Sequence, residues 1–151
     1  MAAIDQLDIV IPEGFERVAD PAVLLIARSE YADAIRKALS PLRQAWSRMA
    51  QRRFSARGRT GVVSFPLGAG RPVMIARRYV HGGLFAPIGR DLYWGPARAV
   101  EELLVADMAF RGGIRVPMPL GILAEPLRGP FWRLAYLSAE ITDSEDMVHY
   151  C

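Results

Sequence analysis

The chain has 151 residues, of which 52% are hydrophobic and 23% charged, which is the composition of a globular protein with a single domain-sized core. No apolar run approaches the ~20 residues that span a bilayer, so no membrane-spanning helix is expected. Cys151 is the single cysteine, which excludes an internal disulfide and disfavours a cysteine-based metal site. Asp5 and Asp8 stand where a secretory signal would be basic and then apolar, so we expect a cytoplasmic protein.

Positive charge is concentrated in the middle of the chain, although the net charge is only +3. Between Asp33 and Asp91 there is no acidic residue, and the basic residues are Arg36, Lys37, Arg43, Arg48, Arg52, Arg53, Arg57, Arg59, Arg71, Arg77, Arg78 and Arg90. Such a block favours an anionic partner, such as phosphate, anionic lipid or nucleic acid. A solvated basic face without any ligand gives the same pattern, and the two interpretations stay open.

The N-terminal segment, residues 1–28, shows only irregular or short extended signals. Its densest apolar run, residues 23–27, fits either a strand or a piece of buried helix. Ser29 is a candidate N-cap for a helix over residues 30–39.

Ser40 and Pro41 then fit the cap and first position of a second helix, which would end near residue 50. The change of pattern beyond this point predicts a boundary. We assign residues 1–51 to a short, basic, helical N-terminal extension and residues 52–151 to the main domain.

The main domain starts as a run of short strands. Their expected positions are residues 54–56, 62–65 and 73–79, with glycine-containing turns at 57–61 and 68–70. A hairpin-connected series of this kind predicts an antiparallel sheet.

One main helix follows this sheet segment. It is expected to begin near Pro96 and to run to about Arg111, where Gly112 and Gly113 end it. Two further strands are expected, one after the proline-rich segment 116–121 and one over residues 132–141. The fold class is therefore α+β, with a five-stranded antiparallel sheet and one main helix. This order of elements is also that of the N-terminal lobe of a protein kinase.

Several short motifs resemble, in the same order, those of the lipopolysaccharide kinase family, whose members phosphorylate Kdo or heptose sugars. The matching stretches are Gly58-Arg59-Thr60-Gly61-Val62, residues 75–84 with His81-Gly82-Gly83, Asp91-Leu92-Tyr93, Glu102, Gly113-Ile114-Arg115-Val116-Pro117-Met118-Pro119 and Ala139-Glu140-Ile141. His81 departs from the family, which usually has arginine at that position. The resemblance implies a protein-kinase-like N-terminal lobe that ends at the hinge.

The resemblance also implies a nucleotide site that begins at a glycine-rich loop. Gly58, Arg59, Thr60 and Gly61 would form this loop, because glycine lets backbone N–H groups approach the phosphates and arginine adds charge. An ordinary hairpin turn would use the same residue types.

Arg77 would be the third-strand cation that contacts the nucleotide phosphates, where most kinases carry lysine. Glu102 would be its partner on the helix. On a helical wheel, Glu102 lies far from Asp107 and Arg111, which we take as the solvent side, and Glu101 is the competing acid. A surface strand arginine and exposed helix acids are the alternatives.

The segment after the last strand would be the kinase hinge, with backbone groups of Glu140, Ile141 and Thr142 binding the adenine. An acidic C-terminal tail would look the same. No catalytic residue and no metal ligand is assigned within this chain, because nothing in it matches the catalytic loop of a C-terminal lobe.

The expected function is that of the nucleotide-binding lobe of an ATP-dependent kinase acting on Kdo or heptose of the lipopolysaccharide core. The cofactors are ATP and Mg²⁺, with the Mg²⁺ ligands in a missing C-terminal lobe, so this chain alone would be inactive and is interpreted as a fragment of a longer gene product. Expected partners are a lipid-linked core sugar, the inner membrane surface as a peripheral contact, and a second copy through an exposed apolar underside.

Two alternatives come from other functional classes. A basic nucleic-acid-binding module is suggested by the aromatic residues Trp46, Phe54 and Tyr79 among the cations, but no nucleic-acid motif supports it. A pseudokinase-like interaction domain would keep the fold without a substrate.

Overall fold

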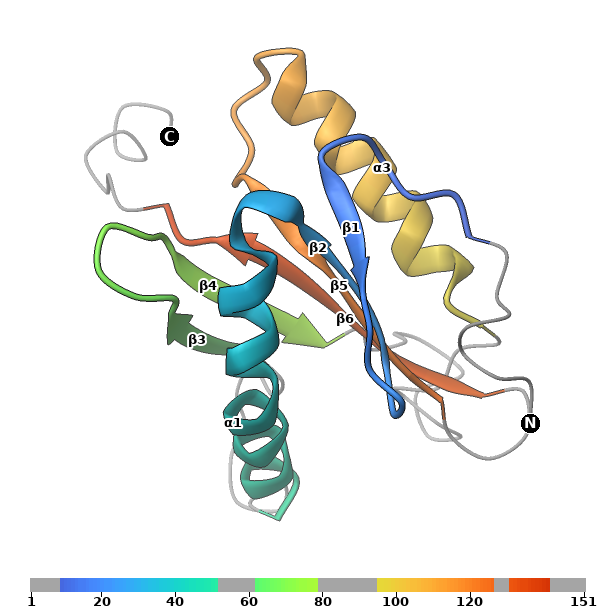
Figure 1. The fold of residues 1–151 in the computed structure, drawn as a ribbon, viewed down its shortest axis with the longest axis vertical. Helices are drawn as coiled ribbons and strands as arrows, with labels where there is room; N and C mark the ends of the chain where they lie inside the picture. The colour runs from blue at the N-terminus through green and yellow to red at the C-terminus, as the bar shows by residue number, and fades with distance from the viewer. Residues whose placement is uncertain (1–8, 52–61, 79–94, 127–130, 142–151) are drawn as a thin grey trace, which may run out of the picture.

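The computed structural model describes residues 9–51, 62–78, 95–126 and 131–141. These residues form a six-stranded antiparallel sheet with one helix on each face (Figure 1). The strands are β1 (Phe15–Val18), β2 (Leu24–Arg28), β3 (Val62–Pro66), β4 (Val73–Arg78), β5 (Pro119–Pro126) and β6 (Trp132–Ala139), in the sheet order β1-β2-β5-β6-β4-β3. A short 3₁₀ turn, η2 (Ser29–Tyr31), precedes helix α1 (Ala32–Gln51), and the second helix is α3 (Ala97–Arg111).

The expected five-stranded sheet is wrong in its strand count, because the N-terminal segment contributes β1 and β2 to the same sheet. In β2, the residues from Leu24 to Ala27 are buried on both faces, which explains the unbroken apolar run in the sequence. β2 pairs with β5, so Leu25 lies opposite Leu123. The proposed division at residue 51 stays a prediction, although the sheet takes strands from both sides of it.

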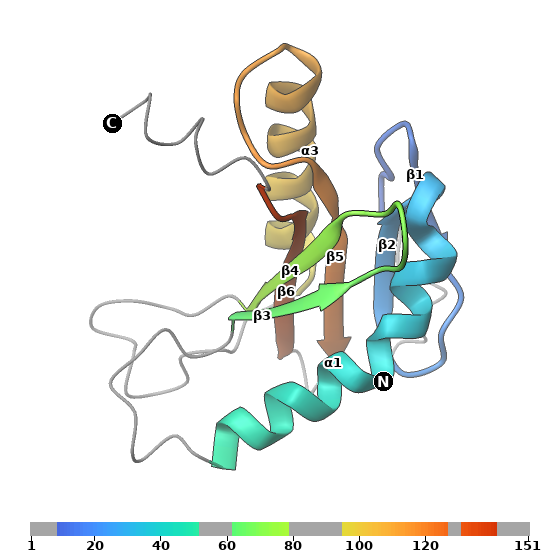
Figure 2. The ribbon, with the colours of Figure 1, turned by 90° about the vertical axis from the view of Figure 1, so that its left-hand side faces the viewer.

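The two helices expected between residues 30 and 50 are one helix, α1, with Pro41 in its interior. Proline has no N–H to donate to the carbonyl of Lys37, and its ring crowds the preceding turn, so a helix that continues through it bends. Figure 2 shows the two halves of α1 running in different directions. Ser40 and Pro41 therefore mark a bend within α1 and not the start of a second helix.

The later elements agree with the sequence predictions. β3, β4 and β6 lie within two residues of the expected strands, and α3 runs from Ala97 to Arg111 after Pro96. Gly112 caps the helix, and Gly113 follows with φ of 82°, a conformation that glycine adopts without strain. The expected strand at 54–56 lies outside the described residues.

Two apolar cores lie on opposite faces of the sheet. On one face, Ile35, Leu39 and Leu42 of α1 pack against alternate residues of β2, β4, β5 and β6. On the other face, Ala99, Val100 and Leu103 of α3 pack against the intervening residues of β2, β5 and β6. The side on which a strand residue points therefore decides which helix it can contact.

β5 and β2 approach each other closely at Gly121, which has φ of 153° and lies at a register shift in the pairing of β5 with β6. A Cβ atom at this position would stand 2.1 Å from the Ile26 carbonyl oxygen. Glycine is therefore required by the contact between the N-terminal strands and the rest of the sheet.

Within the described ranges, no helix has the length and apolar character needed to cross a membrane.

Candidate functional site

Arg77 and Arg78 are neighbours at the end of β4, and their side chains leave the sheet on opposite faces. Met74 and Ala76 belong to the core beneath α1, so Arg78, in the same alternation, lies on the α1 face. There its guanidinium stands 5.4 Å from the ring centre of Trp46. Arg77 is exposed and lies on the α3 face.

Tyr136 of β6 is partly buried and packs against the apolar core beneath α3. It is directly opposite Arg77 in the antiparallel pairing of β4 and β6, so their side chains share one face of the sheet. Burial raises the pKa of Tyr136 to about 12, and the negative charge of Glu102 adds to this rise. Tyr136 is therefore the cross-strand neighbour of Arg77, and the charge of Glu102 on α3 acts on its ionisation.

Glu102 is an exposed residue of α3, and its carboxylate forms an ion pair with Arg98 one turn earlier in the helix, at 3.3 Å. Among the described residues, no ion pair joins Glu102 to Arg77. Because the Glu102–Arg98 pair is exposed, it contributes little stability and can be exchanged for another partner at small cost.

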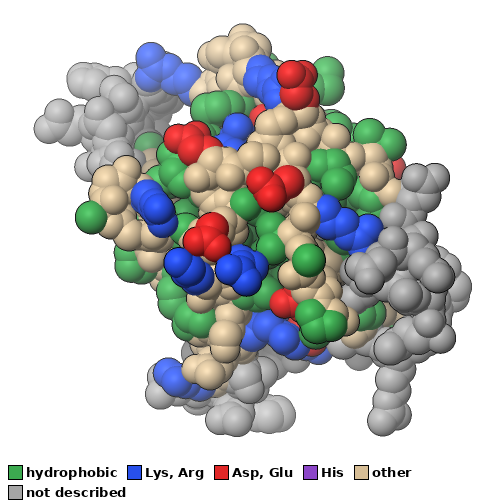
Figure 3. Space-filling model, in the orientation of Figure 1, with side chains coloured by type: hydrophobic (Ala, Val, Ile, Leu, Met, Phe, Trp, Pro, Cys, Tyr) green, Lys and Arg blue, Asp and Glu red, His purple; other side chains and the backbone are tan. Residues whose placement is uncertain are grey.

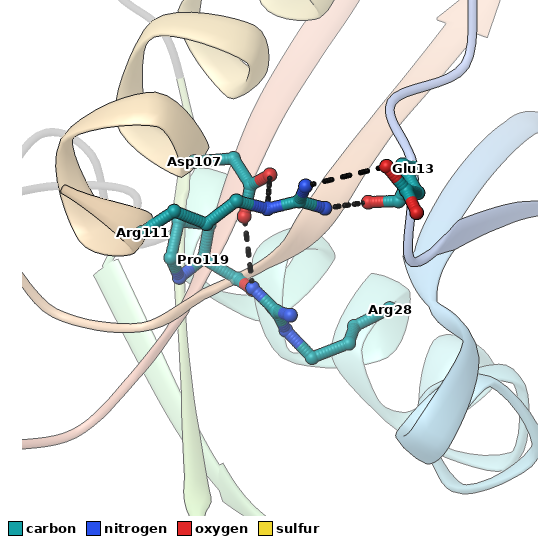
Figure 4. A network of polar contacts seen from close by, with 5 residues as sticks. All are labelled: Glu13, Arg28, Asp107, Arg111 and Pro119. Atoms are coloured by element: carbon teal, nitrogen blue, oxygen red, sulfur yellow. Dashed lines mark hydrogen bonds and ion pairs between the residues drawn. The ribbon is translucent and has the colours of Figure 1, made fainter.

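Asp107 does not mark the solvent side of α3, so the helical-wheel prediction is wrong for this residue. Asp107 is only 5% exposed and is the one charged residue among those described that is fully buried. Its carboxylate binds Arg111 Nε at 2.8 Å and Arg28 Nη2 at 3.3 Å (Figure 4). Sequence reasoning missed this group because Arg28 stands 79 residues away in the chain.

The expected hinge follows β6 directly. The backbone N–H of Glu140 donates a hydrogen bond to the Val73 carbonyl at 2.7 Å, so Glu140 has its carbonyl left to offer an adenine. Ile141 is exposed. Thr142 and the expected glycine-rich loop of Gly58, Arg59, Thr60 and Gly61 lie outside the described residues, as does His81.

Tyr136 was not among the residues predicted from sequence, and an alternating strand pattern with one tyrosine gives no signal for it. Its raised pKa makes a testable difference at alkaline pH. The neutral phenol stabilises the fold fully below the ordinary tyrosine pKa of about 10, and this contribution is lost as the pH rises towards 12.

We therefore expect Tyr136→Phe to lose less stability than the unsubstituted protein when the pH is raised from about 9 to about 11. Urea midpoints at the two pH values measure this. Tyr31→Phe is the control, because Tyr31 packs on the α1 side of the sheet. Equal pH dependence in all three proteins would contradict the burial of the Tyr136 hydroxyl.

The basic block is partly neutralised on α1. Asp33 forms ion pairs with Arg36 at 3.0 Å and with Lys37 at 3.2 Å, and the hydrogen bonds from these residues lower the pKa of Asp33. Arg43 pairs with Glu125 of β5 at 3.3 Å. Figure 3 shows acidic and basic side chains intermixed on the face that carries α1. The described part of this face is therefore not a continuous basic surface.

The similarity of this chain to curated proteins agrees with the resemblance of its motifs to those of lipopolysaccharide kinases. The chain is 31% identical over 78 residues to the 3-deoxy-D-manno-octulosonic acid kinase of Pasteurella multocida, a match that covers 49% of this chain and 32% of that protein. It is 29% identical over 98 residues to the enzyme of the same name from Vibrio vulnificus strain YJ016, covering 62% of this chain and 39% of that protein. This chain is similar to 3-deoxy-D-manno-octulosonic acid kinases.

The similarity to these kinases is distant and partial. The chain spans between about a third and two fifths of the length of the curated relatives that it matches. No family model matches it, and no solved structure matches it significantly. The six-stranded antiparallel sheet with two helices is consistent with the N-terminal lobe of a kinase-like protein.

Proposed function

We propose that this chain is the nucleotide-binding lobe of an ATP-dependent kinase that phosphorylates Kdo or heptose of the lipopolysaccharide core. The observation that carries the proposal is the similarity to 3-deoxy-D-manno-octulosonic acid kinases over up to 98 residues. Phosphoryl transfer depends mainly on positioning the phosphates and stabilising their charge, so the proposed role of the lobe is to hold ATP.

In this proposal Arg77 contacts the phosphates of ATP and Glu102 orients Arg77. What supports it is that Arg77 lies on the α3 face of the sheet, opposite Tyr136 in the strand pairing, and that the charge of Glu102 acts on the same tyrosine. The exposed Arg98–Glu102 pair would then open, and Glu102 would exchange Arg98 for Arg77 when nucleotide binds. A guanidinium can bind phosphate and carboxylate oxygens at once through its planar fork, which suits it to this double contact.

The remaining contacts of ATP are proposed for the glycine-rich loop, Gly58 to Gly61, and for the backbone of Glu140, Ile141 and Thr142. For Glu140 the available group is its carbonyl, since its N–H already bonds to Val73. Mg²⁺ would neutralise the phosphate charge, and we expect its ligands in the C-terminal lobe. The proposed location is cytoplasmic, with peripheral contact to the inner membrane where a lipid-linked sugar is found, and a homodimer through an exposed apolar face remains part of the proposal.

A nucleic-acid-binding function has weaker support. Such a module needs a continuous cationic surface, and three of the α1 cations are engaged with Asp33 and Glu125.

The test is phosphate transfer by the full-length gene product. The protein is incubated with Mg²⁺ and ATP labelled on the γ-phosphate, together with a lipid A precursor that carries Kdo or with the same precursor lacking it. We expect label in the Kdo-bearing acceptor alone. A heptose-bearing acceptor distinguishes the two sugars, and absence of label from every acceptor would contradict the proposed activity.

A further inference from the structure

Three arginines lie together on the α1 face, at the end of the sheet where β5 ends and β6 begins. With the residues that they contact they form what we call the arginine cluster, made of Arg43 and Trp46 of α1, Arg78 of β4, Glu125 of β5 and Arg133 of β6. The C-terminal half of α1 passes beside this end of β5 (Figure 2), so that Arg43 Nη2 stands 3.3 Å from Glu125 Oε1.

The strand pairing brings the other two arginines to the same place. Arg133 lies opposite Glu125 in the pairing of β5 with β6, so their side chains share one face of the sheet. Arg78 lies opposite Ala135, the next residue of β6 on that face, so Arg78 and Arg133 are diagonal neighbours with Cα atoms about 7–8 Å apart. Ala135 belongs to the core beneath α1, which fixes the face as the α1 face.

The positive charge of the cluster exceeds its negative charge by two. Its three guanidiniums stay ionised at physiological pH, and Glu125 is its single carboxylate among the described residues. Asp20 is also at this end of the sheet, but its Oδ1 caps the turn between β1 and β2, and β2 is two strands away from β6. The ring of Trp46, 5.4 Å from the Arg78 guanidinium, holds that side chain without cancelling its charge.

The cluster is also partly removed from water. The side chain of Arg43 is 42% exposed and that of Glu125 is 27% exposed, while Arg78 and Arg133 are half-buried. Like charges at neighbouring positions repel one another more strongly there than in bulk water. A bound anion with two charges therefore relieves a repulsion that the fold already contains.

The chain connections at this end of the sheet supply further positive charge in their sequences. Residues 52–61 join α1 to β3, residues 127–130 join β5 to β6, and residues 79–94 follow β4. The last of these contains one arginine and one aspartate, and the first two contain no acid. The basic residues of the first two are Arg52, Arg53, Arg57, Arg59 and Arg128.

We propose that the arginine cluster binds a phosphate group that carries two negative charges, as a phosphomonoester or a diphosphate does. The planar forks of Arg43 and Arg133 bind its oxygens, and Arg78, held by Trp46, adds its charge. A carboxylate matches the cluster less well, because Glu125 already supplies one and a single further charge leaves the excess uncompensated. The site lies on the face of the sheet opposite to Arg77, so it is separate from the phosphate contacts proposed for ATP.

The first test is isothermal titration of the full-length protein with pyrophosphate in the absence of Mg²⁺. All variants carry Arg77→Ala, so that the phosphate contact proposed for ATP does not contribute. Arg43→Gln combined with Arg133→Gln should weaken pyrophosphate binding by at least about tenfold. Arg36→Gln is the matched control, since it removes an exposed arginine of the same helix that pairs with Asp33, and it should leave the affinity unchanged.

Glu125→Gln gives the sharpest prediction, because it keeps all three arginines and removes only the competing negative charge. We expect pyrophosphate to bind about threefold to tenfold more tightly to this variant, and the gain should shrink as the salt concentration rises. A cluster that serves only to hold α1 on the sheet gives no such gain. This variant alone decides the question if the double arginine variant does not fold.

Two sources carry this phosphate chemistry, a soluble phosphate compound and the headgroup of a lipid. Sedimentation with phosphatidylcholine vesicles, with and without phosphatidic acid, distinguishes them. Retention that needs phosphatidic acid and is lost in the double arginine variant but kept in Arg36→Gln identifies the lipid headgroup. Binding of pyrophosphate without such retention identifies a soluble ligand.

The inference is overturned if the protein binds neither pyrophosphate nor phosphatidic acid, if the double arginine variant binds both as tightly as Arg36→Gln, or if Glu125→Gln weakens binding. None of these measurements uses ATP. Loss of the proposed kinase activity would therefore leave the phosphate site standing, and loss of the phosphate site would leave the kinase proposal standing.

Discussion

Arg77→Ala in the full-length protein is expected to weaken ATP binding by about 10- to 100-fold, which corresponds to the loss of one charge-assisted contact to phosphate. The prediction follows from the position of Arg77, which is exposed on the α3 face of β4 and opposite Tyr136. Isothermal titration with ATP and Mg²⁺ measures the dissociation constant. Arg77→Lys restores the residue that most kinases carry at this position, and it should retain most of the affinity.

Arg78→Ala is the matched comparison, since it removes the same side chain one residue later on the opposite face. Arg78 packs on Trp46 of α1, so its loss should lower the thermal midpoint by several degrees and leave ATP affinity unchanged. The reverse result, in which Arg78→Ala loses ATP and Arg77→Ala does not, would show that the family motif has been aligned one residue out of register.

Among the glycines that the structure describes, Gly121 is the one at which substitution by alanine is expected to cost the most stability. The new Cβ would lie 2.1 Å from the Ile26 carbonyl oxygen and 3.0 Å from the Ala27 Cα. Both are backbone atoms of β2, which is paired on both sides, so relief requires β2 and β5 to separate and lose hydrogen bonds. We expect a cost on the order of 4 kcal/mol, comparable to the whole stability of a marginal domain.

The measurement is the denaturant midpoint followed by circular dichroism. Gly112→Ala is the control, because Gly112 has an ordinary φ of −77° and a Cβ there would stand 3.2 Å from the Met108 carbonyl oxygen. We expect it to cost less than about 1 kcal/mol. If the two variants unfold at the same midpoint, the pairing of β2 with β5 at Gly121 is incorrect.

The main helix and the later strands were predictable because their signals are local. Pro96 before the helix and Gly112 and Gly113 after it mark both ends of α3, and a short apolar run directly after the turn at residues 68–70 marks β4. In each of these cases the residues that decide the element lie within or beside it. The placement of Arg77 and Arg78 on opposite faces was predictable for the same reason, since strand side chains alternate whatever the sheet contains.

The N-terminal segment was harder, because its structure depends on distant residues. The run from Val23 to Ala27 has no helical or alternating period, and it is a strand because β5, about a hundred residues later, pairs with it. Pro41 gave a misleading signal for a similar reason. The packing of Leu39 and Leu42 on the sheet continues the helix through a residue that would interrupt it in isolation.

The burial of Asp107 is the feature that the sequence predicted least well. A charged residue on a helix is normally placed on the solvent side, and the helical wheel of α3 used it in that way. Its burial is stable because Arg28 and Arg111 compensate its charge, and Arg28 comes from the opposite end of the chain. The wheel alone therefore could not show that Asp107 is buried.

The amino-acid sequence by itself determined the α+β class, the ends of α3, the alternation that separates Arg77 from Arg78, and the resemblance to lipopolysaccharide kinases. These properties depend on neighbouring residues or on short motifs read in order. The tertiary structure alone decided that β1 and β2 complete the sheet, that α1 bends and continues through Pro41, and that Asp107 lies inside. Each of these depends on a partner remote in the chain, whose position is set only when the sheet is assembled.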